Sequence, residues 1–164
     1  MFTLQKKRKG KPVAASAIEN RRVFLSWSQM GPHDLFFGGK VLQSIDHHAM
    51  EVAMKHAEQK CQVISIDFIR FFSPARREDI LVCHSSVNHV WNCYLEVGIK
   101  VIAEDFRLLE QKEILSAYFL FQAIDENNLP TEVPLVVPET AEEQRRFAAA
   151  EKRRALRDKS LTIL

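Results

Sequence analysis

The spacing of apolar residues changes once along this chain, and that change limits the fold more than any other feature. From Gly39 to about Glu58 apolar residues recur every three or four positions, which is typical of a helix with one buried face. Four later segments are rich in β-branched and aromatic residues and predict strands: 61–72, 80–90, 93–103 and 114–124. Their short connections indicate antiparallel pairing. A sheet that curls around one long helix would bury that helix, so the sequence predicts an α+β domain.

The flanking segments complete the predicted organisation. Val23, Leu25 and Trp27 alternate with polar residues and predict a first strand, which makes the sheet five-stranded. Near the other end, Thr140 and Glu143 fit a capping box at the start of a helix with few apolar residues, which we expect at the surface or between subunits. The predicted boundaries are a basic, flexible extension over 1–19, a central domain over 20–135, and a C-terminal helix and tail over 136–164.

Composition excludes several classes of protein. The chain has 164 residues and a net charge of +2, which suits one globular domain and gives little reason to expect a nucleic-acid partner beyond the lysines of the N-terminal extension. Its three cysteines form no CxxC motif and favour a reducing compartment. Five glycines cannot assemble a Walker loop, a dinucleotide fingerprint or a nucleophile elbow. Since no signal peptide or membrane span is visible, we expect a cytoplasmic protein.

One constellation carries candidate chemistry. Phe37, Gly38 and Gly39 stand at the predicted helix start, and Asp46 follows about two turns later within an apolar stretch. Two glycines at a helix start let a ligand approach the backbone, and the unpaired amides there can stabilise developing negative charge. Thioester hydrolysis needs such donors together with a carboxylate that activates water or attacks the carbonyl itself. From composition alone, a structural carboxylate bonded to a neighbouring loop is an equally open interpretation of Asp46.

A family resemblance bears on this choice. Between Gly31 and Met50 the sequence PHDLFFGGKVLQSIDHHAM is similar to the signature of hot-dog-fold acyl-CoA thioesterases of the acyl-CoA hydrolase subfamily. Three later stretches resemble the same family in the same order, and the resemblance extends over about residues 20–157. They are 65–74 with Asp79, 117–125 with its Ala-Tyr-Phe and Ala-Ile-Asp, and 133–143 with its Pro-Glu-Thr-Ala-Glu-Glu.

The resemblance implies a hot-dog fold, a homodimer with shared active sites and further assembly as a trimer of dimers. Coenzyme A would lie along the subunit interface with the acyl chain beside the helix, and no metal or organic cofactor is implied. Asp46 corresponds to the family's catalytic carboxylate, and Gly39, with Gly38, to its oxyanion donors. The expected substrate contacts are His33, Asp34, Phe37, Arg70, Arg76 and Asn92. For Arg70 and Arg76, a solvated turn and a contact with the coenzyme phosphates both stay open.

Several positions depart from the family pattern. Relatives usually carry Gly and a polar residue where this chain has Asp34 and Leu35, and a Gly-Arg-Thr/Ser-like sequence near the coenzyme where it has Val90 to Cys93. Two alternative functions therefore stay open: a non-catalytic module that binds acyl-CoA or lipid, and a hydratase or dehydratase of enoyl thioesters. His47 and His48 point in different directions on a helix, which counts against the second alternative. Either histidine lies one helical turn from Glu51 and could share a metal ion with it, but no HExxH motif and no nearby thiol support such a site.

Overall fold

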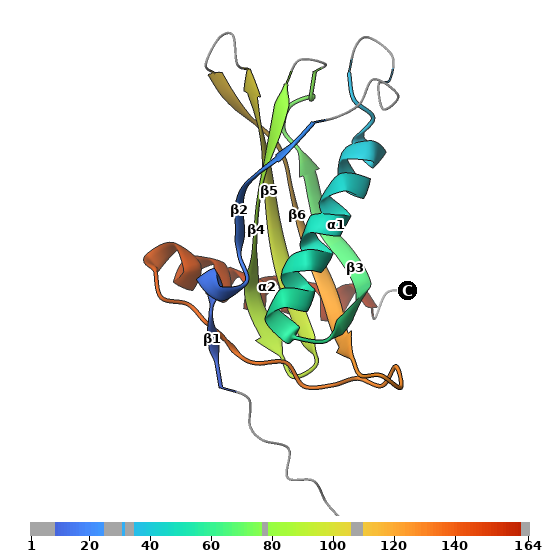
Figure 1. Ribbon diagram of the computed structural model, residues 1–164, viewed down its shortest axis with the longest axis vertical. Coiled ribbons are helices and arrows are strands. Elements are labelled where there is room, and N and C mark those ends of the chain that lie inside the picture. Colours follow the sequence, from blue (N-terminus) through green and yellow to red (C-terminus); the bar gives the residue numbers. More distant parts are fainter. Residues whose placement is uncertain (1–8, 25–30, 32–34, 77–78, 106–109, 162–164) are drawn as a thin grey trace, which may run out of the picture.

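The computed structural model describes residues 9–24, 31, 35–76, 79–105 and 110–161, and they form a sheet with a helix on each face (Figure 1). The five-stranded antiparallel sheet has the order β2-β4-β5-β6-β3. Its strands are β2 (Ile18–Val23), β3 (Lys60–Phe71), β4 (Ile80–Trp91), β5 (Tyr94–Asp105) and β6 (Glu110–Ile124). The helices are α1 (Gly38–Ala57) and α2 (Ala141–Leu161). The predicted five strands, long helix and C-terminal helix are confirmed, and they have the arrangement of the hot-dog fold.

The core lies between α1 and the inner face of the sheet. Helix α1 presents one apolar side to the strands, and Ile45, Ala49 and Val52 on that side are almost fully buried. Phe119 and Phe121 of β6 face them and stack with ring centroids 6.0 Å apart. The predicted spacing of the helix is therefore confirmed, with its start at Gly38, one residue earlier than expected.

The hairpin between β4 and β5 confirms the predicted break near Trp91. Trp91 pairs with Tyr94, so only Asn92 and Cys93 form the turn. Asn92 has φ 54°, a left-handed conformation that asparagine adopts more readily than most residues. An asparagine therefore takes the role that glycine has in most two-residue hairpins.

The N-terminal region differs from the expected extension over 1–19. Strand β1 (Lys11–Pro12) pairs in parallel with β7 (Val136–Val137), and a 3-10 turn (Val13–Ala15) follows. Ser16 is fully buried, and its hydroxyl lies 3.1 Å from Nδ1 of His56 on α1. Nε2 of the same imidazole lies 3.0 Å from the carbonyl oxygen of Pro134, which fixes Nε2 as the protonated nitrogen. Residues 11–18 thus belong to the folded domain, because they pack against the C-terminal end of α1. The part of the predicted first strand at Leu25 and Trp27 lies outside the described residues.

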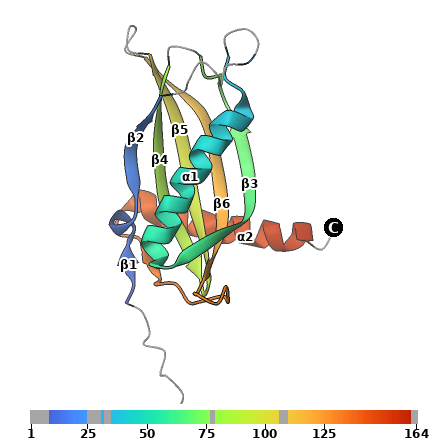
Figure 2. The same cartoon turned by 45° about the vertical axis from the view of Figure 1, so that its right-hand side comes forward.

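Helix α2 crosses the outer face of the sheet, opposite α1 (Figure 2). The predicted capping box is present: the amide of Glu143 donates to Oγ1 of Thr140 at 3.2 Å, and the amide of Thr140 donates to the Glu143 carboxylate at 3.0 Å. The expectation of a surface helix is incomplete, because Arg153 and Arg157 reach the fully buried carboxylate of Glu96 on β5. Arg157 also pairs with Asp67 on β3. Charged contacts therefore attach this weakly apolar helix to the sheet.

Within the described residues, no helix combines the length and the apolar character needed to cross a bilayer.

Candidate active site

The first residues of α1 form one half of the candidate site. Phe37 is the N-cap and contributes no side-chain cap, and its carbonyl oxygen accepts from the amides of Lys40 and Val41 at 2.9 and 3.2 Å. The amides of Gly38 and Gly39 precede these donors and have no acceptor within the helix. The helix dipole adds partial positive charge at this end. A carbonyl oxygen that gains negative charge would be stabilised here.

The two glycines have different surroundings. A Cβ added at Gly38 would lie 3.0 Å from Cζ of Phe71, so this glycine allows the ring of β3 to touch the helix. A Cβ at Gly39 would meet no heavy atom within 4 Å. Gly38 therefore has a packing role, and Gly39 is the position where a ligand can approach the backbone.

Asp46 lies on the same side of α1 as Gly39. Residues seven apart are two turns apart on nearly the same side of a helix, and the axial distance between them is about 10 Å. Glu51 lies about 140° around the helix from Asp46, and its carboxylate accepts from Arg21 of β2 at 2.9 Å. Since β2 and β3 are opposite edges of the sheet, Gly39 and Asp46 face the β3 edge.

The carboxylate of Asp46 lacks a complete set of partners. Its Oδ1 is buried and has no hydrogen-bond partner among the described residues, although the residue as a whole is partly exposed. A buried carboxylate oxygen without a donor costs free energy, and such groups are rare in folded proteins. Among the described residues, no neighbouring loop supplies a donor to this atom, as the interpretation of Asp46 as a structural carboxylate would require. An unpaired oxygen of this kind can accept a proton from a bound water.

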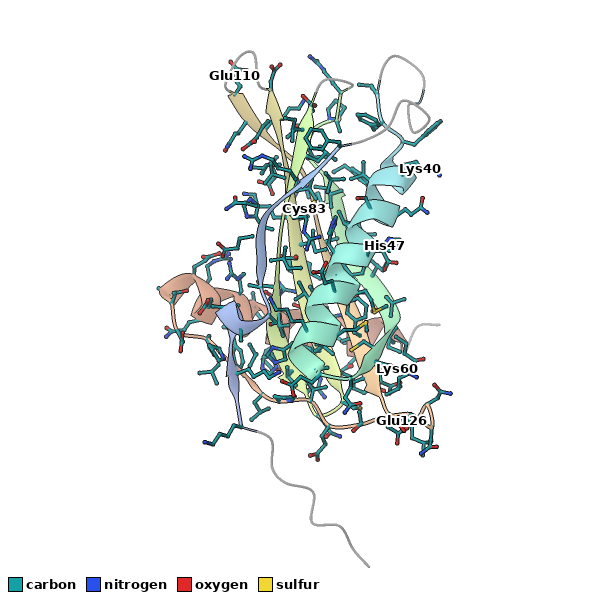
Figure 3. All side chains as sticks on the ribbon, in the orientation of Figure 1. Lys40, His47, Lys60, Cys83, Glu110 and Glu126 are labelled. Carbon is teal, nitrogen blue, oxygen red and sulfur yellow. The ribbon has the colours of Figure 1, made fainter. Side chains whose placement is uncertain are left out.

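The histidines next to Asp46 do not form a pair with it. His48 lies about 160° around the helix from Asp46, on the side that faces Arg21. Burial lowers the pKa of His48, and the charge of Arg21 lowers it further. Nδ1 of His47 lies 3.0 Å from the carbonyl oxygen of Gln43, on the solvent side of α1 (Figure 3). An acid–base pair of an aspartate and a histidine, as a hydratase would use, is therefore not assembled within this helix.

Neither a metal centre nor a nucleophilic thiol emerges from the described residues. No group of three or more His, Cys, Asp or Glu side chains in them is placed to hold a metal ion. Burial raises the pKa of Cys61 to about 12 and that of Cys83 to about 11, so both stay protonated thiols at neutral pH.

The β3 edge beside Asp46 carries an unusual amount of exposed apolar surface. Within the part of the chain that the structure describes, β3 pairs only with β6 and forms the last strand of the sheet. Seven large apolar residues along and just after it are between 38% and 48% exposed: Val63, Ile64, Ile66, Phe68, Ile69, Phe71 and Phe72. A long apolar edge strand is a surface that another chain covers in most proteins.

The other predicted substrate contacts divide between two ends of the molecule. Phe37 is 55% exposed beside the glycines, and the guanidinium of Arg70 lies over the ring of Phe72, 5.2 Å from its centroid. The amide of Arg76 donates to Asp79 at 2.7 Å in the turn after β3, at the same end. Asn92 lies at the other end of the molecule, where α1 finishes. Its neighbour Tyr94 and Lys60, the first residue of β3, both pair with the last residues of β6 (Figure 3). His33 and Asp34 lie outside the described residues.

The sequence did not point to a pocket of about 420 Å³ beside the helix start. Its walls come from the segment that leads into α1, the helix start, the end of β3 with the turn that follows, and β6: Phe36, Gly38, Val41, Phe71, Phe72, Ser73, Pro74, Ala75 and Ile114. The sequence feature at this place is the pair Phe71-Phe72 directly before Ser73-Pro74.

Several known proteins are similar to this chain in sequence. A family model described as the Thioesterase superfamily matches residues 33–110. The Bacillus subtilis protein named uncharacterized acyl-CoA thioester hydrolase YkhA is 35% identical over 111 residues, which cover 68% of this chain and 64% of that protein. Helicobacter pylori VdlD is 33% identical over 125 residues, 76% of this chain and 71% of that protein.

Two solved structures are similar over almost their whole length. A crystal structure of an apo-hexameric acyl-CoA thioesterase has a TM-score of 0.91 and 30% identity, and the match covers 95% of this chain and 99% of that one. Acyl-CoA hydrolase from Staphylococcus aureus, solved with butyryl coenzyme A, coenzyme A and coenzyme A disulfide, has a TM-score of 0.82 and 29% identity, with 93% and 95% covered.

Proposed function

The chain belongs to the thioesterase superfamily, among the hot-dog acyl-CoA thioester hydrolases, and from that premise we propose that it hydrolyses fatty acyl-CoA to the free acid and coenzyme A. The carbonyl oxygen of the thioester binds the amide of Gly39, assisted by that of Gly38. Asp46 supplies the carboxylate, and no metal or organic cofactor takes part. The buried, unpartnered Oδ1 of Asp46 is the observation that carries this proposal.

The spacing of the two groups suits both ways in which Asp46 can act. About 10 Å separates Gly39 and Asp46 along the helix axis. Helical side chains tilt toward the helix N-terminus, so the carboxylate of Asp46 covers roughly 3 Å of that distance, given ordinary bond lengths. The remaining ~7 Å equals a hydrogen bond of about 2.9 Å from the Gly39 amide, a C=O bond of about 1.2 Å and an attack distance of about 3 to 3.5 Å. Asp46 therefore acts either as the nucleophile or, through a water beside the carbonyl, as a general base.

The active assembly is a homodimer formed through the β3 edge. A second copy covers the exposed apolar residues of β3 from Val63 to Ile69, which a single chain leaves in contact with water. An antiparallel arrangement of two β3 strands brings the Gly39 end of one chain beside the β4–β5 hairpin of the other. Asn92 of the partner subunit then lies near the coenzyme, together with Arg70 and Arg76, which contact its phosphates. A trimer of such dimers agrees with the hexameric relatives.

His33, Asp34 and Phe37 contribute to the same substrate site in this proposal. The three free cysteines suit a reducing compartment, and we place the activity in the cytoplasm.

The decisive experiment compares Asp46→Asn with Glu51→Gln. Both changes remove a carboxylate from α1, but Glu51 lies on the side that faces β2 and pairs with Arg21 at the surface. Release of coenzyme A from a panel of acyl-CoAs is measured with a thiol reagent. We expect Asp46→Asn to lower kcat by about 10² to 10⁴ and Glu51→Gln to leave it within a few fold.

Equal turnover by the wild type and Asp46→Asn would reject the role of Asp46. Tight binding of coenzyme A by the wild type with no turnover of any acyl-CoA would favour the non-catalytic module instead. Hydration of a crotonyl thioester faster than its hydrolysis would favour a hydratase.

A further inference from the structure

The pocket beside the helix start has apolar walls. The rings of Phe36 and Phe71 and the side chains of Val41 and Ile114 line it, and no charged side chain is among its lining residues. Phe71 is 48% exposed and Phe72 46% exposed, although both are large and apolar. Aromatic rings held open beside backbone amides suit a ligand with a polar carbonyl and an apolar chain.

The hydrogen bonds around the pocket hold its walls in place. The amide of Phe36 donates to the carbonyl oxygen of Ala75 at 3.1 Å, and the amide of Phe72 donates to that of Ile114 at 2.8 Å. The turn that follows is closed by the amide of Arg76, which donates to the Asp79 carboxylate, and by Lys112, whose ammonium lies 2.8 Å from the same oxygen. The pocket is therefore a built feature of the fold and does not depend on loose side chains.

Gly38 connects the pocket to the proposed oxyanion donors. It lines the pocket, and its amide is one of the two that begin α1. The ring of Phe71 lies against this residue, since a Cβ at Gly38 would be 3.0 Å from Cζ. If the carbonyl of a thioester is bound at the helix start, its acyl chain would thus lie along the face or the edge of the Phe71 ring.

We propose that this pocket receives the acyl chain of the substrate and that Phe71 is the residue that sets the accepted chain length. The inference rests on the proposed thioester hydrolysis and deepens it by naming the determinant of acyl specificity. Phe36, Phe72 and Ile114 form the remaining apolar walls.

The size of the pocket limits the chain. A volume of about 420 Å³ lies near the lower end of the range for small-molecule sites. If each methylene takes roughly the ~30 Å³ of a water molecule, the pocket holds no more than about fourteen such groups. Part of the pocket is open to solvent, so fewer methylenes than this are buried, and affinity should stop rising at or below that chain length.

The test uses S-alkyl coenzyme A thioethers, which cannot be hydrolysed, with chains of 2 to about 16 carbons, the upper end chosen to exceed the estimated capacity. Calorimetric affinity should rise roughly fourfold for each methylene that becomes buried and then level off when the pocket is full. Phe71→Ala should move this plateau to longer chains, and Phe71→Trp should move it to shorter ones. Phe24→Ala is the matched control, because Phe24 is 74% exposed next to β2 at the other edge of the sheet.

Superimposable affinity profiles for the wild type and both Phe71 variants would overturn the assignment, as would affinities that do not depend on chain length. If the partner subunit fills the pocket instead, Phe71→Ala weakens the dimer in sedimentation analysis and leaves the profile unchanged, which also overturns it. A shifted plateau together with no turnover of any acyl-CoA would support the pocket and reject hydrolysis, so the two proposals can fail separately.

Discussion

The buried carboxylate of Glu96 should be one of the most important single groups for the stability of this protein. It is fully buried in β5, accepts from Arg153 Nη2 at 2.7 Å and from Nδ2 of Asn88 at 3.1 Å, and pairs with Arg157. Removal of one partner from a buried ion pair costs about 3 to 5 kcal/mol. Arg157 would keep Asp67, and Arg153 would keep its position over the Tyr118 ring, 3.7 Å from the centroid. We therefore expect Glu96→Gln to cost about 3 kcal/mol, the lower end of that range.

The measurement is urea unfolding at one fixed protein concentration, because dissociation of an oligomer contributes to its apparent stability. In thermal unfolding of a chain of this size, the same loss of about 3 kcal/mol corresponds to a fall in Tm of roughly 6 to 12 °C. Glu104→Gln on the same strand is the control, since Glu104 pairs with Arg22 at the surface at 3.2 Å and should contribute less than about 1 kcal/mol. Equal effects of the two substitutions would refute the reasoning.

The comparison of the wild type with Glu96→Gln also predicts how their difference in stability depends on pH. Burial alone would raise the pKa of Glu96, but the hydrogen bonds and charge of Arg153, with hydrogen bonds from Arg157 and Asn88, hold it below its ordinary value of 4.5. A group with a lowered pKa in the folded state stabilises the fold above its unfolded pKa and loses that contribution as the pH falls through the folded pKa. The difference in stability between the wild type and Glu96→Gln should therefore be complete at pH 7 and shrink below about pH 4.5.

Two further substitutions test other parts of the structure. His56→Ala removes an imidazole that is fully buried between Ser16 and the Pro134 carbonyl, so it should lower the free energy of unfolding by about 3 kcal/mol, and an unchanged urea midpoint would contradict this role. Ile66→Lys places a charge among the exposed apolar residues of β3, and we expect sedimentation to show dissociated chains without thioesterase activity; Leu156→Lys, on the exposed side of α2, should change neither property.

The elements that sequence alone predicted well are those that neighbouring residues determine. The helical spacing from Gly39 to Glu58 and the capping box of Thr140 and Glu143 depend on residues a few positions apart. The β4–β5 hairpin carries a weaker signal in the sequence, because an asparagine at φ 54° replaces the glycine that most two-residue hairpins contain.

The features that sequence could not predict depend on residues far apart in the chain. Glu96 alternates with apolar residues and would be taken for a solvent-facing side chain of a strand, and its partners Arg153 and Arg157 follow 57 and 61 positions later. Ser16 is buried only because His56, 40 positions away, reaches it. At the candidate site, the family resemblance points to Asp46, Gly38 and Gly39, but only the structure separates the packed Gly38 from the open Gly39.

Strand β3 links the proposed dimer contact to the proposed active site. Helix α1 covers the inner face of the sheet and α2 crosses its outer face, yet β3 keeps a row of half-exposed apolar residues. The same edge flanks the side of α1 that carries Gly39 and Asp46, and it ends in the aromatic pair that lines the pocket. In the proposed dimer, a second chain that buries this edge would exclude water from the carboxylate and the amides at the same time, and a lower local dielectric would strengthen the interactions of both. The apolar β3 edge, whose burial would stabilise the assembly, is thus also the surface whose burial would exclude water from the proposed active site.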